Sequence, residues 1–107
     1  MANEDKEMEN YQMIQQQLQL IMLQRQQMKL QDEELDHALQ EVEKASGNMY
    51  RLVGPILLEA KKDEVVRDLQ EKKGSVGSRL ELLTKQEERL KKNLADLRKT
   101  LERTDRK

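Results

Sequence analysis

The chain has 107 residues, of which 38% are charged and 36% hydrophobic, with two tyrosines and no cysteine, tryptophan or phenylalanine. So few bulky side chains argue against a compact single-core fold and favour long exposed helices, and the lack of cysteine excludes a disulfide framework. A net charge of −1 provides no basic field that would recruit nucleic acid or an anionic membrane.

The first ten residues, MANEDKEMEN, are acidic and polar, and residues 1–8 are predicted to form a flexible N-terminus. No apolar run in the sequence is long enough to span a bilayer, and no signal for secretion is present. Together with the absence of cysteine, these features predict a reducing, cytoplasmic location.

The first half of the chain repeats apolar residues at spacings of three and four, which predicts a coiled-coil helix over residues 9–45. The seam of this helix is Tyr11, Ile14, Leu18, Ile21, Arg25, Met28, Asp32, Leu35, Leu39 and Val42. The segment YQMIQQQLQLIMLQRQQMKLQ, residues 11–31, carries nine glutamines and also has large apolar residues off the seam. These off-seam residues are Met13, Leu20, Leu23 and Leu30.

A different pattern follows over residues 46–62 and predicts a β-hairpin. The sequence SGN, residues 46–48, can end the first helix, because glycine and asparagine tolerate the left-handed cap conformation. The strands are predicted at Met49–Val53 and Ile56–Ala60. Between them, Gly54 can take a positive φ and Pro55 supplies the negative φ that a type II′ turn needs next.

A second heptad seam predicts a coiled-coil helix over residues 63–102, with Asp63 as its N-cap and residues 103–107 as a flexible C-terminus. This seam is Val66, Leu69, Lys73, Val76, Leu80, Leu83, Glu87, Leu90, Leu94, Leu97 and Leu101. Gly74 and Gly77 interrupt the helix, and each costs about 1 kcal/mol relative to alanine. The interruption is either a tolerated weak point or a packing site for a close neighbour.

The predicted fold is therefore mostly α: a long antiparallel two-helix coiled coil joined by a single β-hairpin. Folding back at the hairpin makes the numbers of facing positions sum to about 108, which brings Arg25 near Glu87 and Asp32 near Lys73. Charges in a seam forgo roughly 1.5–3 kcal/mol of burial per side chain, while ion pairs near solvent return about 1 kcal/mol or less. We interpret these pairs as devices that fix the register of the coil.

Residues that could perform catalysis are absent from the pattern. The single histidine, His37, falls on the outer face of the first helix, and the carboxylates alternate with lysines and arginines as on ordinary solvated faces. The sequence contains no metal-ligand spacing, no phosphate-binding glycine loop and no nucleophile with a base. We expect the protein not to be an enzyme and to need no cofactor or metal.

The hairpin segment is too apolar to remain exposed. Its candidate assembly residues are Met49, Tyr50, Leu52, Val53, Gly54, Pro55, Ile56, Leu57 and Leu58. An isolated two-stranded hairpin is marginal in water, so hairpins from several chains are expected to join in a shared sheet or barrel.

Three stretches resemble the prefoldin beta-type subunits of archaea and their eukaryotic relatives. YQMIQQQLQL is similar to the glutamine-rich opening helix of the family, and MYRLVGPILLEA, residues 49–60, resembles its hairpin. SVGSRLELL, residues 75–83, resembles a Val-x-x-Arg-Leu pattern in the second helix. The resemblance spans about residues 9 to 102, and Glu59 departs from it, since related chains often have a basic or aliphatic residue there.

This resemblance implies a hetero-hexamer of two alpha-type and four beta-type chains, whose hairpins form an intersubunit β-barrel. It also implies an ATP-independent chaperone that binds unfolded proteins and delivers them to a group II chaperonin, without nucleic-acid or membrane partners. The clients are expected to bind at the coiled-coil ends far from the hairpin. The predicted client-binding residues are Met8, Tyr11, Met13, Ile14, Leu94, Leu97 and Leu101.

Several alternatives remain open at the level of sequence. The off-seam apolar residues are ordinary exposed aliphatics, client contacts, or contacts with another subunit. A structural coiled-coil protein that only oligomerises or tethers is the main alternative function. An acidic helical module that binds nucleic acid is a weaker one, and would require steeply salt-dependent binding.

Overall fold

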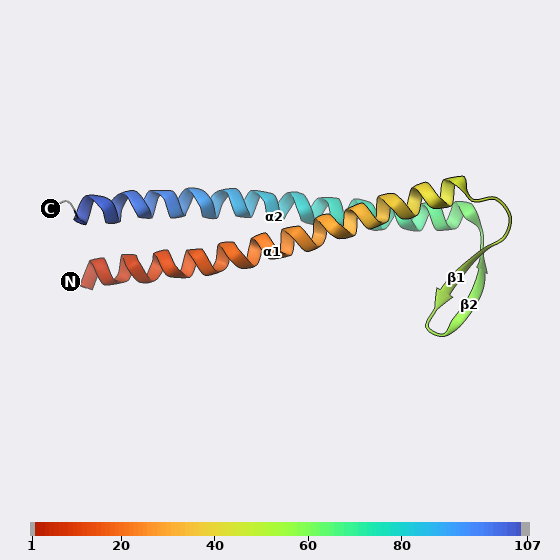
Figure 1. Cartoon of the computed structure of the whole chain (residues 1–107), viewed down its shortest axis with the longest axis horizontal. Helices are drawn as coiled ribbons and strands as arrows, with labels where there is room; N and C mark the ends of the chain where they lie inside the picture. The colour runs from red at the N-terminus through yellow and green to blue at the C-terminus, as the bar shows by residue number, and fades with distance from the viewer. Residues whose placement is uncertain (1, 106–107) are drawn as a thin grey trace. The chain divides into compact units, whose positions relative to one another are not determined.

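The computed structural model describes the backbone of residues 2–105 and the side chains of residues 5–103. It consists of two long helices with one hairpin between them (Figure 1). The elements are α1 (Ala2–Lys44), β1 (Met49–Val53), β2 (Ile56–Ala60) and α2 (Lys62–Asp105). The predicted order of two helices with a single antiparallel hairpin between them is confirmed.

The residues divide into two compact units. The terminal unit contains α1 up to Gln27 and α2 from Leu80, and the hairpin unit contains Met28–Arg79. Within each unit, segments of α1 and α2 lie side by side and run antiparallel (Figure 1).

Both helices extend beyond the predicted ends. α1 begins at Ala2 rather than at residue 9, and α2 continues past residue 102 to Asp105. The seam predicts only where the helices pack against each other. A helix can continue beyond its packed part when its residues have high intrinsic helix propensity, as alanine, glutamate, lysine and methionine do. Residues 1, 106 and 107 of the two predicted flexible ends lie outside the described residues.

The start of α2 corrects the predicted cap. The backbone N–H of Val65 donates to the carbonyl of Lys61 at 3.0 Å, so Lys61 occupies the cap position and Asp63 lies in the first turn. There the carboxylate of Asp63, with that of Glu64, is stabilised by the partial positive charge at the helix N-terminus. Asp63 is therefore a first-turn residue and not the N-cap.

The hairpin has the predicted two-residue turn. Val53 pairs with Ile56, so Gly54 and Pro55 form the loop, and the φ of Gly54 is 58°. Among residues 2–105, positive φ is found only at Gly47 and Gly54, so Pro55 has a negative φ, as a type II′ turn requires.

The end of α1 is held by a side chain that sequence reasoning missed. The Nζ of Lys62 donates to the carbonyl of Glu43 at 2.9 Å and lies 3.4 Å from the carbonyl of Ala45. Carbonyls at the C-terminal end of a helix lack an N–H donor from the same helix. A cation at this end is also favoured by the helix dipole. Gly47 then adopts a φ of 94°, which lets the chain leave the helix.

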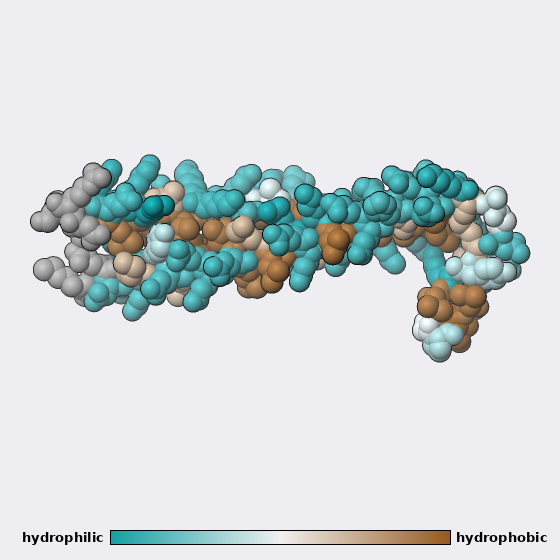
Figure 2. Space-filling view, viewed as in Figure 1, coloured by the Kyte–Doolittle hydropathy of each residue, from teal (hydrophilic) through white to brown (hydrophobic). Residues whose placement is uncertain are grey.

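The interior is narrow, as expected for a two-helix coil. Every predicted seam residue of both helices is half-buried or buried, and among residues 5–103 only Leu83 and Glu87 are buried, at 4% and 5% exposure. Figure 2 shows apolar side chains between the helices and on the hairpin, and polar side chains on the outer faces. Neither helix has, within its described residues, a stretch of the length and apolarity needed to cross a bilayer.

The two glycines of α2 have open space around them. A Cβ added at Gly74 or Gly77 would meet no atom within 4 Å beyond the helix itself. This result favours a tolerated weak point over a packing site within the chain. We expect Gly74→Ala and Gly77→Ala each to raise the free energy of unfolding by about 0.5–1 kcal/mol, because alanine loses less backbone entropy on folding.

Chemical denaturation followed by circular dichroism measures this effect. Gly54→Ala is the control, since its positive φ strains any other residue, and it should be destabilising. A loss of stability on substitution of Gly74 or Gly77 would contradict the interpretation of a weak point.

Candidate interaction surfaces

Large apolar side chains cover the hairpin. Tyr50, Leu52, Val53, Ile56, Leu57 and Leu58 are between 50% and 69% exposed, and we call these six residues the hairpin surface. The sheet has two strands, so both of its outer edges are also unpaired. Exposed strand edges and a contiguous apolar patch are both typical of surfaces that are covered by another chain.

The strand register divides the hairpin into two faces, because cross-strand partners point to the same side of a sheet. The inner face carries Met49, Arg51, Val53, Ile56, Leu58 and Ala60. The outer face carries Tyr50, Leu52, Leu57 and Glu59. Met49 and Ala60 are half-buried, and the guanidinium of Arg51 makes an ion pair with Asp68 of α2, so the base of the inner face lies against the helices of its unit. Val53, Ile56 and Leu58 of the same face remain exposed.

The contact between Arg51 and Asp68 was not predicted. Both side chains are more than 40% exposed, so the pair contributes little to stability by itself. It joins the middle of β1 to α2 and therefore restrains how the hairpin is presented. The only signal in the sequence is the opposite charge of two residues on either side of a strand-to-helix connection.

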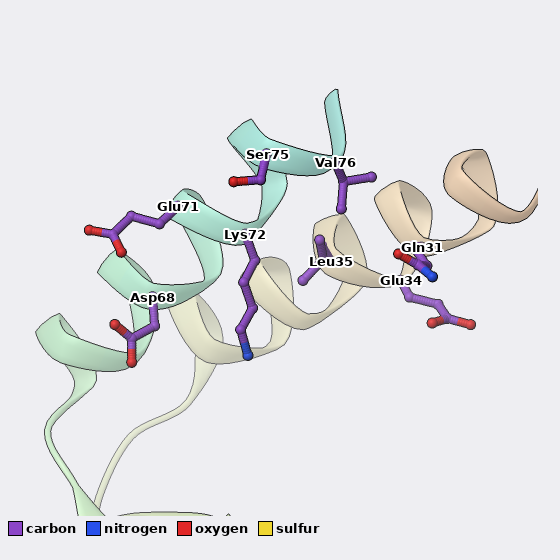
Figure 3. Close-up of a pocket in the computed structure, with 8 residues that line it drawn as sticks. All are labelled: Gln31, Glu34, Leu35, Asp68, Glu71, Lys72, Ser75 and Val76. Atoms are coloured by element: carbon purple, nitrogen blue, oxygen red, sulfur yellow. The ribbon is translucent and has the colours of Figure 1, made fainter. Parts of the chain in front are cut away.

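A groove in the hairpin unit lies next to this contact (Figure 3). It has a volume of about 610 Å³. Its lining residues are Gln31, Glu34, Leu35, Asp68, Glu71, Lys72, Ser75 and Val76. Figure 3 shows Leu35 of α1 and Val76 of α2 close together between the helices, with the carboxylates of Asp68 and Glu71 extending to the side.

The predicted client-binding residues all lie in the terminal unit, in two environments. Met8 and Met13 are about half exposed, while Tyr11, Ile14, Leu94, Leu97 and Leu101 are half-buried in the seam. The structure brings Tyr11 and Leu94 together in a groove of about 370 Å³. Ala95, Arg98, Lys99 and Glu102 complete the lining of this groove.

Sequence reasoning missed these four lining residues. Ala95, Arg98 and Glu102 each directly follow a seam leucine of α2, so they flank the seam on one side. The groove has an apolar floor and charged sides, and Arg98 and Glu102 form an ion pair at 3.3 Å. A floor of this kind can take an apolar side chain while its rim contacts a polar backbone.

The off-seam apolar residues of α1 are all exposed. Leu20 also lines a groove of about 230 Å³ in the terminal unit, together with Gln17, Ile21, Gln86, Arg89 and Leu90. Met13, Leu23 and Leu30 line none of these three grooves. His37 is exposed, in agreement with its predicted place on the outer face.

The charged seam residues meet as the register requires. Arg25 Nε lies 2.5 Å from Glu87 Oε2, and Lys91 Nζ lies 3.2 Å from Glu87 Oε1. The first contact is an ion pair rather than a directed hydrogen bond, since the buried Nε of Arg25 has no hydrogen-bond partner of acceptable geometry. In the hairpin unit, Lys73 Nζ lies 3.3 Å from Asp32 and 2.5 Å from Asp36.

These contacts shift two pKa values in the direction that stabilises the charges. Burial acts to raise the pKa of Glu87, but Lys91 and Arg25 together outweigh it and hold the pKa below its ordinary value. The pKa of Lys73 is raised, first by its hydrogen bond to Asp36, against the opposing effect of desolvation.

The lowered pKa of Glu87 predicts a pH-dependent contribution to stability. A carboxylate with a lowered folded pKa adds stability above its unfolded pKa of about 4.5, and this stability is lost as the pH falls through the folded pKa. We expect the difference in unfolding free energy between the wild type and Glu87→Gln to shrink between pH 6 and about pH 3.

Denaturant unfolding at several pH values measures this difference. Glu88→Gln is the matched control, because Glu88 is exposed and has no ion-pair partner among the described side chains. A difference for Glu87→Gln that stays constant with pH would contradict the assignment.

The part of the chain with described side chains contains no group of three or more histidine, cysteine, aspartate or glutamate residues that could hold a metal ion. The features described above are surfaces. One is the apolar hairpin surface, and the others are grooves between two helices.

Comparison with known proteins bears on what such surfaces serve. A family model described as prefoldin subunit matches residues 5–104. The prefoldin subunit beta of Methanococcoides burtonii is 37% identical over 92 residues, covering 84% of this chain and 79% of the relative. That of Archaeoglobus fulgidus is 36% identical over 93 residues, covering 85% and 80%.

Solved structures agree with the sequence comparison. The crystal structure of the prefoldin beta subunit from Thermococcus strain KS-1 superposes with a TM-score of 0.92 at 29% identity, covering 97% of this chain and 93% of that one. The beta2 subunit from the same strain superposes with a TM-score of 0.71 at 26% identity, covering 81% and 95%. With its two helices, single hairpin and match over nearly its whole length, the chain belongs to the prefoldin subunit family.

Proposed function

We propose that this chain is a beta-type subunit of a hetero-hexameric chaperone, which binds unfolded proteins without ATP and delivers them to a group II chaperonin in the cytoplasm. The observation that carries the proposal is the exposed hairpin surface, set between two antiparallel helices in a chain that matches prefoldin beta subunits. The assembly surface belongs to the hairpin unit, and the ends of the helices belong to the terminal unit.

The hairpin surface is the proposed site of assembly. Burying side chains such as Leu52 and Leu57 would contribute roughly 1.5–3 kcal/mol each, and both strand edges can accept further strands. The proposed complex has two alpha-type and four beta-type chains, with their hairpins closed into a barrel. Closure into a barrel removes the edges that would otherwise aggregate.

The ends of the helices are the proposed client site. Met8 and Met13 are exposed there, and the groove of Tyr11 and Leu94 offers an apolar floor. Methionine side chains adapt to varied partners because they are flexible and polarisable. Several weak contacts, one from each subunit of a complex, would hold a client firmly through effective concentration and still permit its release.

The charged seam pairs are proposed to fix the register on which this groove depends. The ion pair of Arg25 with Glu87 lies in the same unit as Tyr11 and Leu94. A slip by one heptad would separate Tyr11 from Leu94 and would also leave Glu87 without Arg25. Alignment rather than stability is therefore the advantage that we assign to these charges.

The proposal is tested by mixing the purified chain with a prefoldin alpha-type subunit. We expect a hexamer by light scattering that suppresses aggregation of chemically denatured citrate synthase without nucleotide. Removing residues 1–14 and 94–107 should abolish suppression and leave the hexamer intact, since the hairpin unit is untouched. Unchanged suppression by the truncated complex would contradict the client site.

The same mixture tests the alternative of a tethering protein. A stable dimer of this chain alone that takes up no alpha-type subunit would favour a structural coiled coil without chaperone activity. Steeply salt-dependent binding to DNA would instead support a nucleic-acid partner.

A further inference from the structure

The outer face of the hairpin carries one carboxylate without a partner. Glu59 lies opposite Tyr50 in the strand register and shares its face with Leu52 and Leu57. Its side chain is exposed and makes no hydrogen bond or ion pair with any side chain that the structure describes. A chain that covers this apolar face would therefore also remove water from the carboxylate of Glu59.

Covering an ionised carboxylate is costly unless it is paired. Desolvation of an unpaired charge costs several kcal/mol, whereas an opposite charge with good geometry offsets much of that cost. Opposite charges across an interface also exclude partners that bring the same charge. The carboxylate of Glu59 thus favours a cationic group on the chain that covers the outer face.

A second copy of this chain cannot supply that cation from its hairpin. Arg51 is the only basic residue between Met49 and Ala60, and it lies on the inner face, where it pairs with Asp68. Contact between the outer faces of two copies would instead bring two Glu59 carboxylates to one apolar interface. Self-association through this face is therefore penalised, although the face is otherwise apolar.

We propose that Glu59 determines partner specificity: the strand that covers the outer face belongs to a different subunit and presents a lysine or arginine to Glu59. This inference rests on the proposed function, which makes the hairpin the assembly surface. It adds the residue that separates mixed assembly from self-assembly.

The test uses the full chain, an alpha-type prefoldin subunit from the same organism, and two substitutions. Glu59→Lys is expected to weaken mixed assembly about tenfold or more in sedimentation experiments, because it places two cations together. Glu59→Leu is expected to raise self-association of the chain alone about tenfold or more, because it removes the penalised charge.

Glu33→Lys and Glu33→Leu are the matched controls. Glu33 is an exposed glutamate of α1 in the same unit, with no partner among the described side chains. All four variants should keep the wild-type circular dichroism spectrum, since both glutamates are exposed and neither makes a hydrogen bond or ion pair with a described side chain. Mixed assembly of the wild type should also weaken with added salt more than that of Glu59→Leu.

The outcomes separate this inference from the proposed function. A mixed complex that forms equally well with wild type, Glu59→Lys and Glu33→Lys would overturn the role of Glu59 and leave the proposed function standing. Failure of the wild-type chain to join any alpha-type subunit would overturn both.

Discussion

We expect the replacement of Leu52 and Leu57 together by aspartate to abolish assembly with an alpha-type subunit and to leave the helices folded. These residues face each other across the strands and are 69% and 63% exposed in the single chain. Their loss removes roughly 1.5–3 kcal/mol of burial at each position, so the assembly constant should fall at least about a hundredfold. The added carboxylates would lower it further on desolvation.

Size-exclusion chromatography with light scattering measures the loss, and circular dichroism checks the helices. Leu82→Asp is the matched control, because Leu82 is also an exposed leucine, at 57%, and belongs to α2 of the terminal unit rather than to the hairpin. It should assemble normally. A hexamer formed by the doubly substituted hairpin would show that another surface holds the subunits together.

Replacing Arg25 by alanine should cost about 2 kcal/mol of unfolding free energy, much more than the loss of an exposed ion pair. Glu87 is 5% exposed and would keep only Lys91, which is itself mostly in solvent. Removing one partner of a fully buried pair costs about 3–5 kcal/mol, and exposed pairs contribute less than about 1. The partly exposed Arg25 places this pair between those limits.

Arg98→Ala is the control for this substitution, because Arg98 and Glu102 form an exposed pair on one helix and should contribute about 0.5 kcal/mol or less. Denaturant unfolding of single and double variants provides a double-mutant cycle. Equal losses for Arg25→Ala and Arg98→Ala would contradict the importance of the seam pair. Replacing Arg25 and Glu87 together by leucine should be neutral or stabilising, which would separate stability from alignment.

Cysteine crosslinking can then report alignment in the double-leucine variant, since the native chain has no cysteine. Ile21 and Leu90 line the same groove, so cysteines placed there should crosslink in the native register. Cysteines at Ile21 and Leu97, one heptad away, should crosslink only if the register has slipped. Crosslinking of the second pair is expected in the double-leucine variant alone.

The seam and the hairpin were predictable from sequence because each depends on local spacing. Within each helix the seam residues, such as Ile14 of α1 and Leu83 of α2, are spaced three and four positions apart. Only a helix puts residues with this spacing on one face. Gly54-Pro55 between two apolar runs likewise permits few turns other than the one observed. The meeting of Arg25 with Glu87 followed once both elements were in place.

Other features depend on geometry that spacing does not encode. The ion pair of Arg51 with Asp68 and the bond from Lys62 to the end of α1 depend on how the hairpin leaves the helices. The grooves depend on side-chain volumes at facing positions, which is why Arg98 was missed although Leu94 was predicted. The helix ends were missed because residues before Met8 continue the helix by propensity alone.

The order of the elements has a consequence for synthesis of the chain on the ribosome. All of α1 is translated before any residue of α2. The seam of α1, from Tyr11 to Val42, therefore has no partner until α2 is translated. During that interval the nine glutamines of residues 11–31 are the main solubilising groups of a segment with only two charges. We therefore expect the polar residues of this helix to keep the nascent chain soluble before it has a partner to fold against.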